Sequence, residues 1–230
     1  MKTTETFPKT YRMIFPPLTP TTAFDAVILG DGDFPLHDIP MGILKNAQYL
    51  CCCDGAGMRL VQIHGIVPDA IVGDGDSLTE DFKIRYRHLI YIVSEQEDND
   101  LTKATRHCMA RGYKRIAYLG ATGKREDHTL GNISLMVRYL KDFHLETMMI
   151  TNHGYFIPFE GDATFGTFPH QQVSIFNFGA TQLRGNGLKW EPYPFKEWWQ
   201  GTLNEATTCS VSFTNNGIAC VFLTFSAKRC

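Results

Sequence analysis

The segment AIVGDGDS, residues 70–77, joins a short apolar run to two aspartates that are separated by one glycine. Asp and Gly both favour tight turns, because the Asp side chain bonds to its own backbone and Gly tolerates a positive φ. Asp74 and Asp76 would then simply mark the end of a strand. Alternatively, they bind one hard divalent cation, and the glycines let a phosphate approach the backbone closely. The remainder of the chain has to distinguish these two interpretations.

Similar apolar runs recur along the first two-thirds of the chain. They are nearly continuous, as in strands covered on both faces, and occupy residues 26–30, 48–53, 70–73, 89–93, 115–120 and 147–151. Between them, apolar residues at helical spacing, such as Leu101, Ala104 and Cys108, predict amphipathic helices, and a second apolar stripe runs from Leu130 to Leu140. This alternation predicts an α/β domain over residues 22–152, a mostly parallel, Rossmann-like sheet flanked by helices.

The last third of the chain has the pattern of an all-β domain. Apolar and polar residues alternate, as in strands with one exposed face, in segments 171–178, 208–213 and 218–225. The Asn215–Gly217 segment predicts a hairpin turn between the last two of these. No convincing helix follows Phe143, apart from a turn near residues 194–199. We therefore predict a small β-sandwich over residues 153–230.

Composition narrows the class of protein. With 43% hydrophobic and 20% charged residues the chain is an ordinary globular one, and its net charge of −2 gives no footprint for nucleic acid. No apolar run reaches the ~18 residues of a membrane span.

The seven cysteines include no Cys-x-x-Cys pair, so they support neither a disulfide framework nor a zinc site. Cys51–Cys53 are expected to be buried in a strand. The Thr- and Pro-containing first twenty or so residues predict a loosely held lead-in without a signal peptide, so a cytoplasmic location is expected.

Each of the first five apolar runs ends in a cluster of glycines or polar residues. Because ligands bind beyond the carboxyl ends of the strands in an open parallel sheet, five clusters at one edge predict an acidic, glycine-lined ligand site. The clusters lie at residues 30–33, 54–57, 74–77, 94–100 and 121–128.

The residue types in these clusters suit Mg²⁺ and phosphate. Asp74, Asp76 and Asp100 would offer three carboxylates, although Mg²⁺ usually takes one or two together with waters and phosphates. The loop GATGKR, residues 120–125, predicts a phosphate-binding turn before a helix, but it is not a Walker A loop. Lys103 lies three residues after Asp100, on the same helix face.

Each of these features also has a structural explanation. Asp100 would favour the positive end of a helix, Lys103 would be solvated, and Arg125 with Asp127 would be a weak surface ion pair. The arrival of all the clusters at one sheet edge favours a functional site.

Several ordered motifs resemble those of the thiamine pyrophosphokinase family over residues 25–225. They are CCDGAG (52–57), GDGDS (73–77), EDNDLTKA (97–104), GATGKREDHTLGN (120–132), GLKW (187–190) and GTLNE (201–205). The resemblance implies an α/β domain followed by a β-sandwich, assembled as a homodimer with active sites at the subunit interface. It also implies transfer of a diphosphate from ATP to the hydroxyl of thiamine, which yields thiamine diphosphate and AMP.

The resemblance further implies roles for individual residues. Those around Mg²⁺ would be Asp74, Asp76 and Asp100. Those on the ATP side would be Asp54, Ser77, Lys103, Gly120, Gly123, Arg125 and Asp127. Those that contact thiamine would be Gln96, Trp190, Thr202 and Asn204, with Trp190 stacking on thiamine in the partner subunit's site. Catalysis would rest on the three metal-site aspartates with Arg125 and Asp127, and the general base would be either Asp100 or Asp127.

The sequence also departs from the family pattern. The substituted positions are Gly75, Asn99, Ala121, Lys124 and Leu203. Two other functions therefore stay open. One is a different Mg²⁺-dependent kinase that transfers a single phosphoryl group to another small alcohol. The other is a non-catalytic module that binds a nucleotide or thiamine diphosphate.

Overall fold

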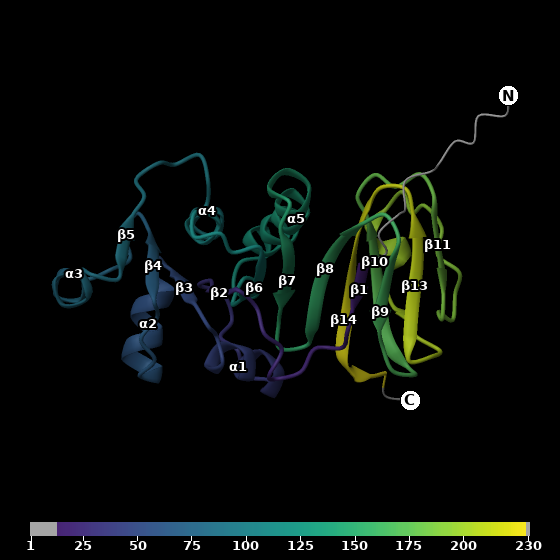
Figure 1. Cartoon of the computed structure of the whole chain (residues 1–230), viewed down its shortest axis with the longest axis horizontal. Helices are drawn as coiled ribbons and strands as arrows, with labels where there is room; N and C mark the ends of the chain where they lie inside the picture. The colour runs from purple at the N-terminus through teal and green to yellow at the C-terminus, as the bar shows by residue number, and fades with distance from the viewer. Residues whose placement is uncertain (1–12, 229–230) are drawn as a thin grey trace, which may run out of the picture. The chain divides into compact units, whose positions relative to one another are not determined.

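The computed structural model describes residues 13–228, and its chain divides into two compact units (Figure 1). Leu18–Pro158 form the first, here called the α/β unit. The second, the β unit, combines the described residues before Leu18 with those from Phe159 onward. An α/β part followed by a β-rich part is the predicted fold class, which is confirmed.

The α/β unit is built on parallel strands in the order β7-β6-β2-β3-β4-β5, with β8 antiparallel to β7. The strands are β2 (Ala26–Leu29), β3 (Leu50–Cys53), β4 (Ala70–Gly73), β5 (Ile90–Ile92), β6 (Arg115–Leu119), β7 (Glu146–Ile150) and β8 (Gly154–Glu160). Every predicted run is therefore a strand. The order reverses at β2, which pairs with both β3 and β6, and ligands bind at such switch points.

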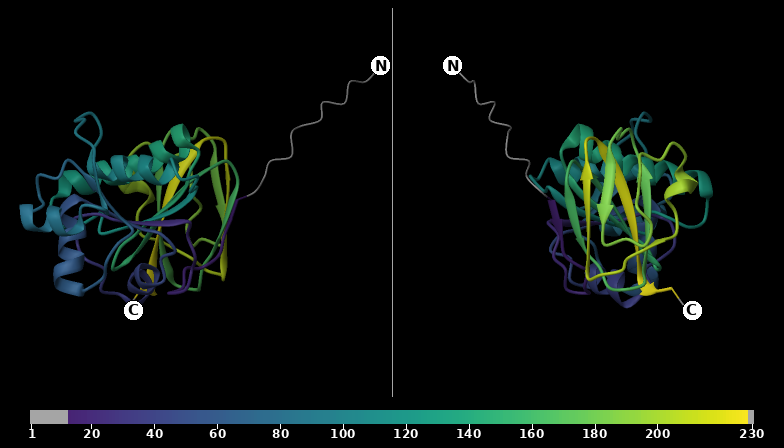
Figure 2. Two further views of the ribbon diagram at one scale, coloured as in Figure 1. Left: turned by 60° about the vertical axis from the view of Figure 1, so that its left-hand side comes forward. Right: turned by 90° about the vertical axis from the view of Figure 1, so that its right-hand side faces the viewer.

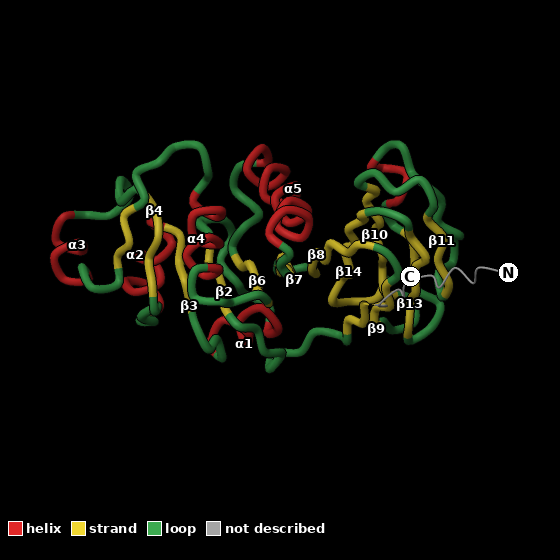
Figure 3. The backbone as a smooth tube through the Cα atoms, turned by 45° about the horizontal axis from the view of Figure 1, so that its top comes forward, coloured by secondary structure: helices red, strands yellow, loops and turns green. Residues whose placement is uncertain are grey.

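Helices flank the strands of this unit (Figure 3). They are α1 (Asp38–Lys45), α2 (Asp54–His64), α3 (Glu80–Tyr86), α4 (Asp100–Met109) and α5 (Glu126–Phe143). Alternate residues of β4 serve different helices, because successive side chains of a strand point to opposite faces. Val72 joins the buried cluster that contains Ala104 of α4, whereas Ile71 packs so closely on α2 that only a glycine fits at position 57.

Two local expectations for this unit are wrong. The strand β5 is not covered on both faces, because it is the last strand of the sheet and Tyr91 and Ile92 are exposed. In α5, the predicted stripe fails at its first position, because Leu130 is 55% exposed; Ile133 does pack against the core cluster, but the fully buried side chains are Met136 and Tyr139. The Tyr139 hydroxyl lies 2.7 Å from Thr102 Oγ1, and this hydrogen bond lets a polar-tipped side chain occupy the core.

The β unit is a sandwich of two sheets (Figure 2). One has the order β1-β9-β13-β11, and β10 of the other pairs with β12 and β14. The elements are β1 (Met13–Phe15), β9 (Ala163–Gly166), β10 (Gln171–Asn177), β11 (Leu183–Asn186), the 3₁₀ helix η1 (Trp198–Gly201), β12 (Asn204–Glu205), β13 (Ser210–Asn215) and β14 (Ile218–Ala227). The ring of Phe159 at the end of β8 contacts those of Phe165 and Phe213, and these rings form the buried centre.

The predicted hairpin at Asn215–Gly217 is wrong. The chain does turn there, and the Asn215 side chain donates to the Gly217 carbonyl at 2.7 Å. However, β13 and β14 belong to different sheets. An alternating pattern shows only that each strand buries one face. Two such strands can pair side by side in one sheet, or they can belong to the two sheets of a sandwich and face each other across its core.

The N-terminal segment also differs from its expected irregular state. Met13–Phe15 form β1, parallel to β9, and the Phe15 ring stacks on Phe165 with centroids 4.9 Å apart. The earlier part of the expected lead-in lies outside the described residues.

Cys51–Cys53 are buried in β3 as predicted. Over residues 13–228, none of the helices combines the length and the apolar character needed to cross a membrane.

Candidate active site

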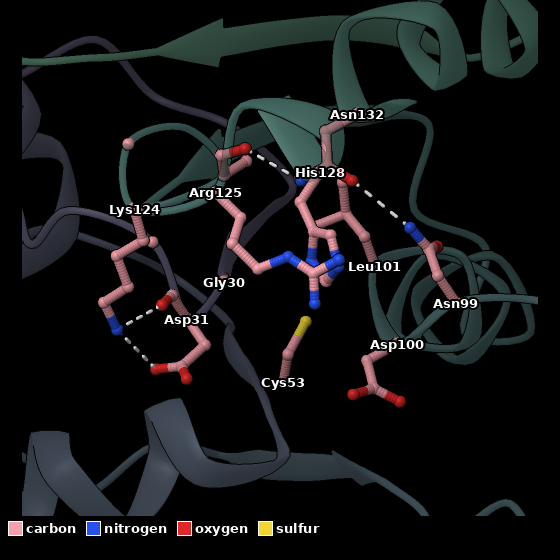
Figure 4. A pocket seen from close by; sticks show the side chains of 14 residues that line it. Gly30, Asp31, Cys53, Asn99, Asp100, Leu101, Lys124, Arg125, His128 and Asn132 are labelled. Carbon is pink, nitrogen blue, oxygen red and sulfur yellow. Dashed lines mark hydrogen bonds and ion pairs between the residues drawn. The ribbon is translucent and has the colours of Figure 1, made fainter. Parts of the chain in front are cut away.

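A pocket of about 340 Å³ opens where β2, β3 and β6 end (Figure 4). The loops after β2 and β6, the end of β3 at Cys53, the start of α4 and the first two turns of α5 line it. Arg125 and His128 point into it, with Lys124 and Asp31 to one side and Asn99 and Asp100 to the other (Figure 4). The pocket therefore combines cations and carboxylates at the switch point of the sheet.

Glycines allow the two loops beside β2 and β6 to form one wall of this pocket. Backbone N–H groups of Gly30, Gly32 and Asp33 donate to carbonyls of residues 119–122, at 2.6–2.8 Å. A Cβ atom at Gly32 would collide with the Thr122 carbonyl, and one at Gly123 would collide with the Asp33 carboxylate. This wall is thus fixed by the backbone before any side chain contributes.

Asp54 connects the loops after β3 and β4. Its side chain is buried, and its Oδ2 accepts a hydrogen bond from Ser77 N at 3.1 Å. Its Oδ1 is also buried, but it has no hydrogen-bond partner among the described residues. An unpaired buried carboxylate oxygen is costly, so Asp54 retains capacity to accept a donor or a cation.

The opening Gly-Asp-Gly-Asp segment forms a turn as well as part of the site. Asp74 Oδ1 accepts from Asp76 N at 3.1 Å, as expected for an Asp turn, and Gly75 has a φ of 82°. This backbone hydrogen bond, with smaller contributions from Gln96 and from the Lys103 charge, lowers the pKa of Asp74. Asp76 itself is exposed. The turn interpretation is therefore confirmed without excluding a ligand role.

Lys103 places a buried positive charge among the aspartates. Its side chain is only 3% exposed, and its Nζ lies 3.7 Å from Asp100 Oδ1. Burial raises the pKa of Asp100; the Lys103 charge opposes this, and the carboxylates of Asp54 and Asp74 add to it. The alternative interpretation from the sequence, that Lys103 is a solvated surface lysine, is therefore wrong.

The three aspartates expected around Mg²⁺ are not assembled in advance. Within residues 13–228 there is no group of three or more His, Cys, Asp or Glu side chains arranged to hold a metal ion. The oxygen chemistry nevertheless suits Mg²⁺, because the unpartnered Asp54 Oδ1 and the carboxylates near Lys103 are hard donors. Protein sites for Mg²⁺ often use one or two carboxylates and take the remaining ligands from water and phosphate.

The start of α5 supplies the cationic side of the pocket. Arg125 Nη2 lies 2.5 Å from Asp127 Oδ2, and both side chains are largely exposed. Arg125 lines the pocket together with Gly120 and Gly123, whereas Asp127 is not among the lining residues. Asp127 therefore orients Arg125, and it is also one of the two candidates for the general base.

Sequence reasoning gave no role to an asparagine pair that joins α4 to α5. Asn99 Nδ2 donates to Asn132 Oδ1 at 3.2 Å, and Asn132 Nδ2 donates to the Ala121 carbonyl at 2.8 Å. Asn99 also caps α4 by accepting from Thr102 N at 3.0 Å. A helix-capping asparagine was visible in the sequence, but its partner 33 residues later was not.

A second pocket, of about 330 Å³, lies in the β unit. Trp190, Thr202 and Asn204, which the sequence expects to contact thiamine, all line it. The Trp190 ring is 51% exposed. Asn204 is buried and holds the Trp190 backbone from both sides, since its Oδ1 accepts from Trp190 N at 3.2 Å and its Nδ2 donates to Trp190 O at 2.7 Å. Gln96 belongs to the α/β unit, in the exposed loop after β5.

Comparison with protein families gives two matches. The family described as thiamin pyrophosphokinase, catalytic domain, matches residues 41–149, and thiamin pyrophosphokinase, substrate-binding domain, matches residues 154–222. Among curated proteins, thiamin pyrophosphokinase 1 of Caenorhabditis elegans is 26% identical over 104 residues. That alignment covers 42% of this chain and 42% of the relative, so the matched part spans less than half of either protein.

Solved structures share the fold. Thiamin pyrophosphokinase from Candida albicans has a TM-score of 0.73 at 16% identity, and the match covers 96% of this chain and 95% of that one. The yeast thiamin pyrophosphokinase has a TM-score of 0.72 at 15% identity, covering 93% and 91%. The thiamine pyrophosphokinase from Bacillus subtilis has a TM-score of 0.71 at 19% identity, covering 86% and 98%.

We predict that Lys103→Met raises the pKa of Asp100 further in the metal-free protein, because the neighbouring positive charge is removed. A carboxyl whose pKa is higher in the folded state stabilises the fold at low pH, and this contribution is lost as pH rises through that pKa. The variant should therefore lose about 1–3 kcal/mol of stability at neutral pH, a range reduced because Asp100 is partly exposed, and regain part of it in acid.

NMR titration of the carboxyl carbons and urea unfolding at several pH values measure both effects. Lys83→Met, which removes a lysine whose partner Glu80 is exposed, is the matched control. A loss of stability that is the same at every pH would contradict the electrostatic explanation.

Proposed function

This chain belongs to the thiamin pyrophosphokinase family, whose two domain models together match most of its length, and we propose that it transfers a diphosphate group from ATP to the hydroxyl oxygen of thiamine. The products would be thiamine diphosphate and AMP. The observation that best supports this reaction is the pocket at the switch point, where a glycine loop and Arg125 share the lining with Asp100, whose ion-pair partner Lys103 is buried. Phosphoryl-type transfer depends mainly on positioning and on neutralising charge, and these residue types supply both.

The ATP phosphates would bind along the loop after β6. Gly120 and Gly123 line the pocket and leave room for an anion close to the backbone, while the Arg125 guanidinium offers paired donors to phosphate oxygens. Lys103 would add a second, buried positive charge. Asp54 would fix the loop of Ser77 through the observed hydrogen bond and so shape the floor of the site.

Mg²⁺ would be held by Asp74, Asp76 and Asp100 together with phosphate oxygens. When bound, the ion would neutralise charge on the polyphosphate and help to orient it. Because the three carboxylates are not assembled in advance, one or two of them would hold the ion directly and the nucleotide would complete its shell. An aspartate at this edge, Asp100 or Asp127, would accept the proton from the thiamine hydroxyl.

Thiamine would bind against Trp190. Its thiazolium ring is a permanent cation, and the half-exposed indole provides the aromatic face that attracts such a charge. Thr202 and Asn204 line the same pocket, and Asn204 would act mainly by holding the Trp190 backbone, since most of its amide is already hydrogen-bonded. Gln96 would be the contact from the α/β unit.

We predict that incubation with ATP, Mg²⁺ and thiamine yields AMP, and that Asp74→Asn and Asp76→Asn each reduce turnover by several orders of magnitude. Nucleotide chromatography and circular dichroism would follow product and fold. Formation of ADP would indicate the alternative single-phosphoryl kinase, and binding without turnover would indicate a non-catalytic module. If both variants stay within about tenfold of wild type, equivalent to ~1.4 kcal/mol of barrier, the metal assignment is wrong.

The protein is expected to be a homodimer with active sites at the subunit interface. In the β unit, Trp190, Trp198 and Trp199 all expose part of their rings, and aromatic residues are enriched in protein interfaces. Light scattering at micromolar concentration should therefore give twice the 26.0 kDa chain mass. A monomer would contradict the shared site. Within residues 13–228, Cys51, Cys52, Cys53 and Cys108 are buried thiols outside any disulfide, and they support a reducing, cytoplasmic location.

We predict that Trp190→Ala weakens thiamine binding by ~1–2 kcal/mol, the range for a desolvated cation–π contact, and leaves ATP affinity nearly unchanged. Trp190→Phe should recover part of the loss. Separate measurements of Kd for thiamine and for ATP make the test. Trp199→Ala removes another exposed indole that does not line the pocket, and it should change neither Kd. Equal weakening of both ligands by Trp190→Ala would exclude the stacking role.

A further inference from the structure

Lys124 occupies a backbone conformation that ordinary residues avoid. Its φ is 57°, in the left-handed region, and it lies between Gly123 and Arg125 in the wall of the pocket. An L-residue crowds its own carbonyl in this region, whereas glycine adopts it without penalty. Strain of this kind concentrates at functional sites. The side chain of Lys124 therefore needs an explanation.

The ammonium of Lys124 is bound to the loop after β2. Its Nζ donates to the Asp31 carbonyl at 2.5 Å and lies 3.4 Å from Asp31 Oδ1 (Figure 4). The same carboxylate also forms an ion pair with Arg59 Nη2. Two cations thus share one carboxylate beside the pocket, and the Asp33 carboxylate lies close enough to act on Lys124 as well.

This contact is not required to hold the wall together. The loops after β2 and β6 are already joined by backbone hydrogen bonds and by glycine packing. About half of the side-chain surface of both Lys124 and Asp31 is exposed, and exposed ion pairs contribute little to stability. Stability alone therefore does not account for a lysine at this strained position.

We propose that Lys124 is a phosphate-binding residue of the ATP pocket, bound to Asp31 in the free protein and transferred to the polyphosphate when ATP binds. The proposal rests on the proposed function, because it needs an anion in this pocket. Lysine has three donors, of which Asp31 engages two at most. A polyphosphate carries several negative charges and competes well against a single carboxylate.

The ion pair with Arg59 means that Asp31 would not become unpaired when Lys124 moves to the polyphosphate. When Lys124 leaves, the Asp31 carboxylate keeps its ion pair with Arg59 and is not left without a cation. Partial burial and the nearby Arg59 charge lower the pKa of Lys124, the Asp33 carboxylate partly opposes them, and an arriving phosphate would oppose them further. Arg59 thus stays with Asp31, and Lys124 is the cation that would move to the nucleotide.

The test is calorimetric binding of inorganic tripolyphosphate and of ATP, with melting temperature measured on the same samples. Lys124→Gly should weaken both ligands about tenfold, the loss of roughly one charge-assisted hydrogen bond, and leave the melting temperature unchanged or higher. Asp31→Asn removes the carboxylate but keeps the backbone carbonyl as a partner of the ammonium, so it loosens the contact and should leave binding unchanged or tighter. His144→Gly is the matched control, since His144 also has a left-handed φ, of 55°, but lies at the far end of α5.

Different results would overturn the proposal. Unchanged binding in Lys124→Gly would show that the lysine does not contact phosphate. Weaker binding in Asp31→Asn, together with a lower melting temperature in both variants, would show that the ion pair is only structural. If the wild-type protein binds tripolyphosphate but not ATP, the proposed function fails, while the comparison of variants still decides the role of Lys124. If it binds neither ligand, both proposals fail.

Discussion

The pairing of β2 with two parallel neighbours is the constraint on which the rest of the α/β unit depends. Because β3 lies on one side of β2 and β6 on the other, the loops that follow all three strands emerge at the same edge. The loops after β2 and β6 then approach so closely that glycine is needed at position 32, next to the Thr122 carbonyl, and at position 123, next to the Asp33 carboxylate. The pocket is therefore a consequence of strand order.

Within that frame, charge is distributed unevenly. Aspartates gather on the side of β3 and β4 around the buried Lys103, and cations gather at the start of α5 and on the loop of Lys124. Carboxylates would repel a polyphosphate if they lined the pocket alone. Their placement beside a buried ammonium, together with the exposed cations, would let the proposed site attract both an anion and a divalent cation.

The sequence predicted the features that depend on short segments. Continuous apolar runs identified the strands of the α/β unit, and the clusters at their ends predicted that Asp54, Asp74, Asp76 and Asp100 lie at one edge of the sheet. It failed where a pattern is compatible with two arrangements. Alternation in β13 and β14 does not say whether the strands pair or face each other, and the apolar stripe of α5 missed Tyr139, whose hydroxyl is bonded in the core. The contacts of Asn99 with Asn132 and of Lys124 with Asp31 join distant residues and leave no periodic signal.

The position of β1 has a consequence for the order in which the protein matures. Met13 pairs with Ala163, so the first described strand of the β unit waits for its neighbour until most of the chain has been synthesised. The α/β unit, whose strands are contiguous in sequence from Leu18 to Pro158, has no such delay. On the ribosome, the α/β unit would thus emerge complete, while β1 remains an unpaired strand that chaperones or a second nascent chain can reach.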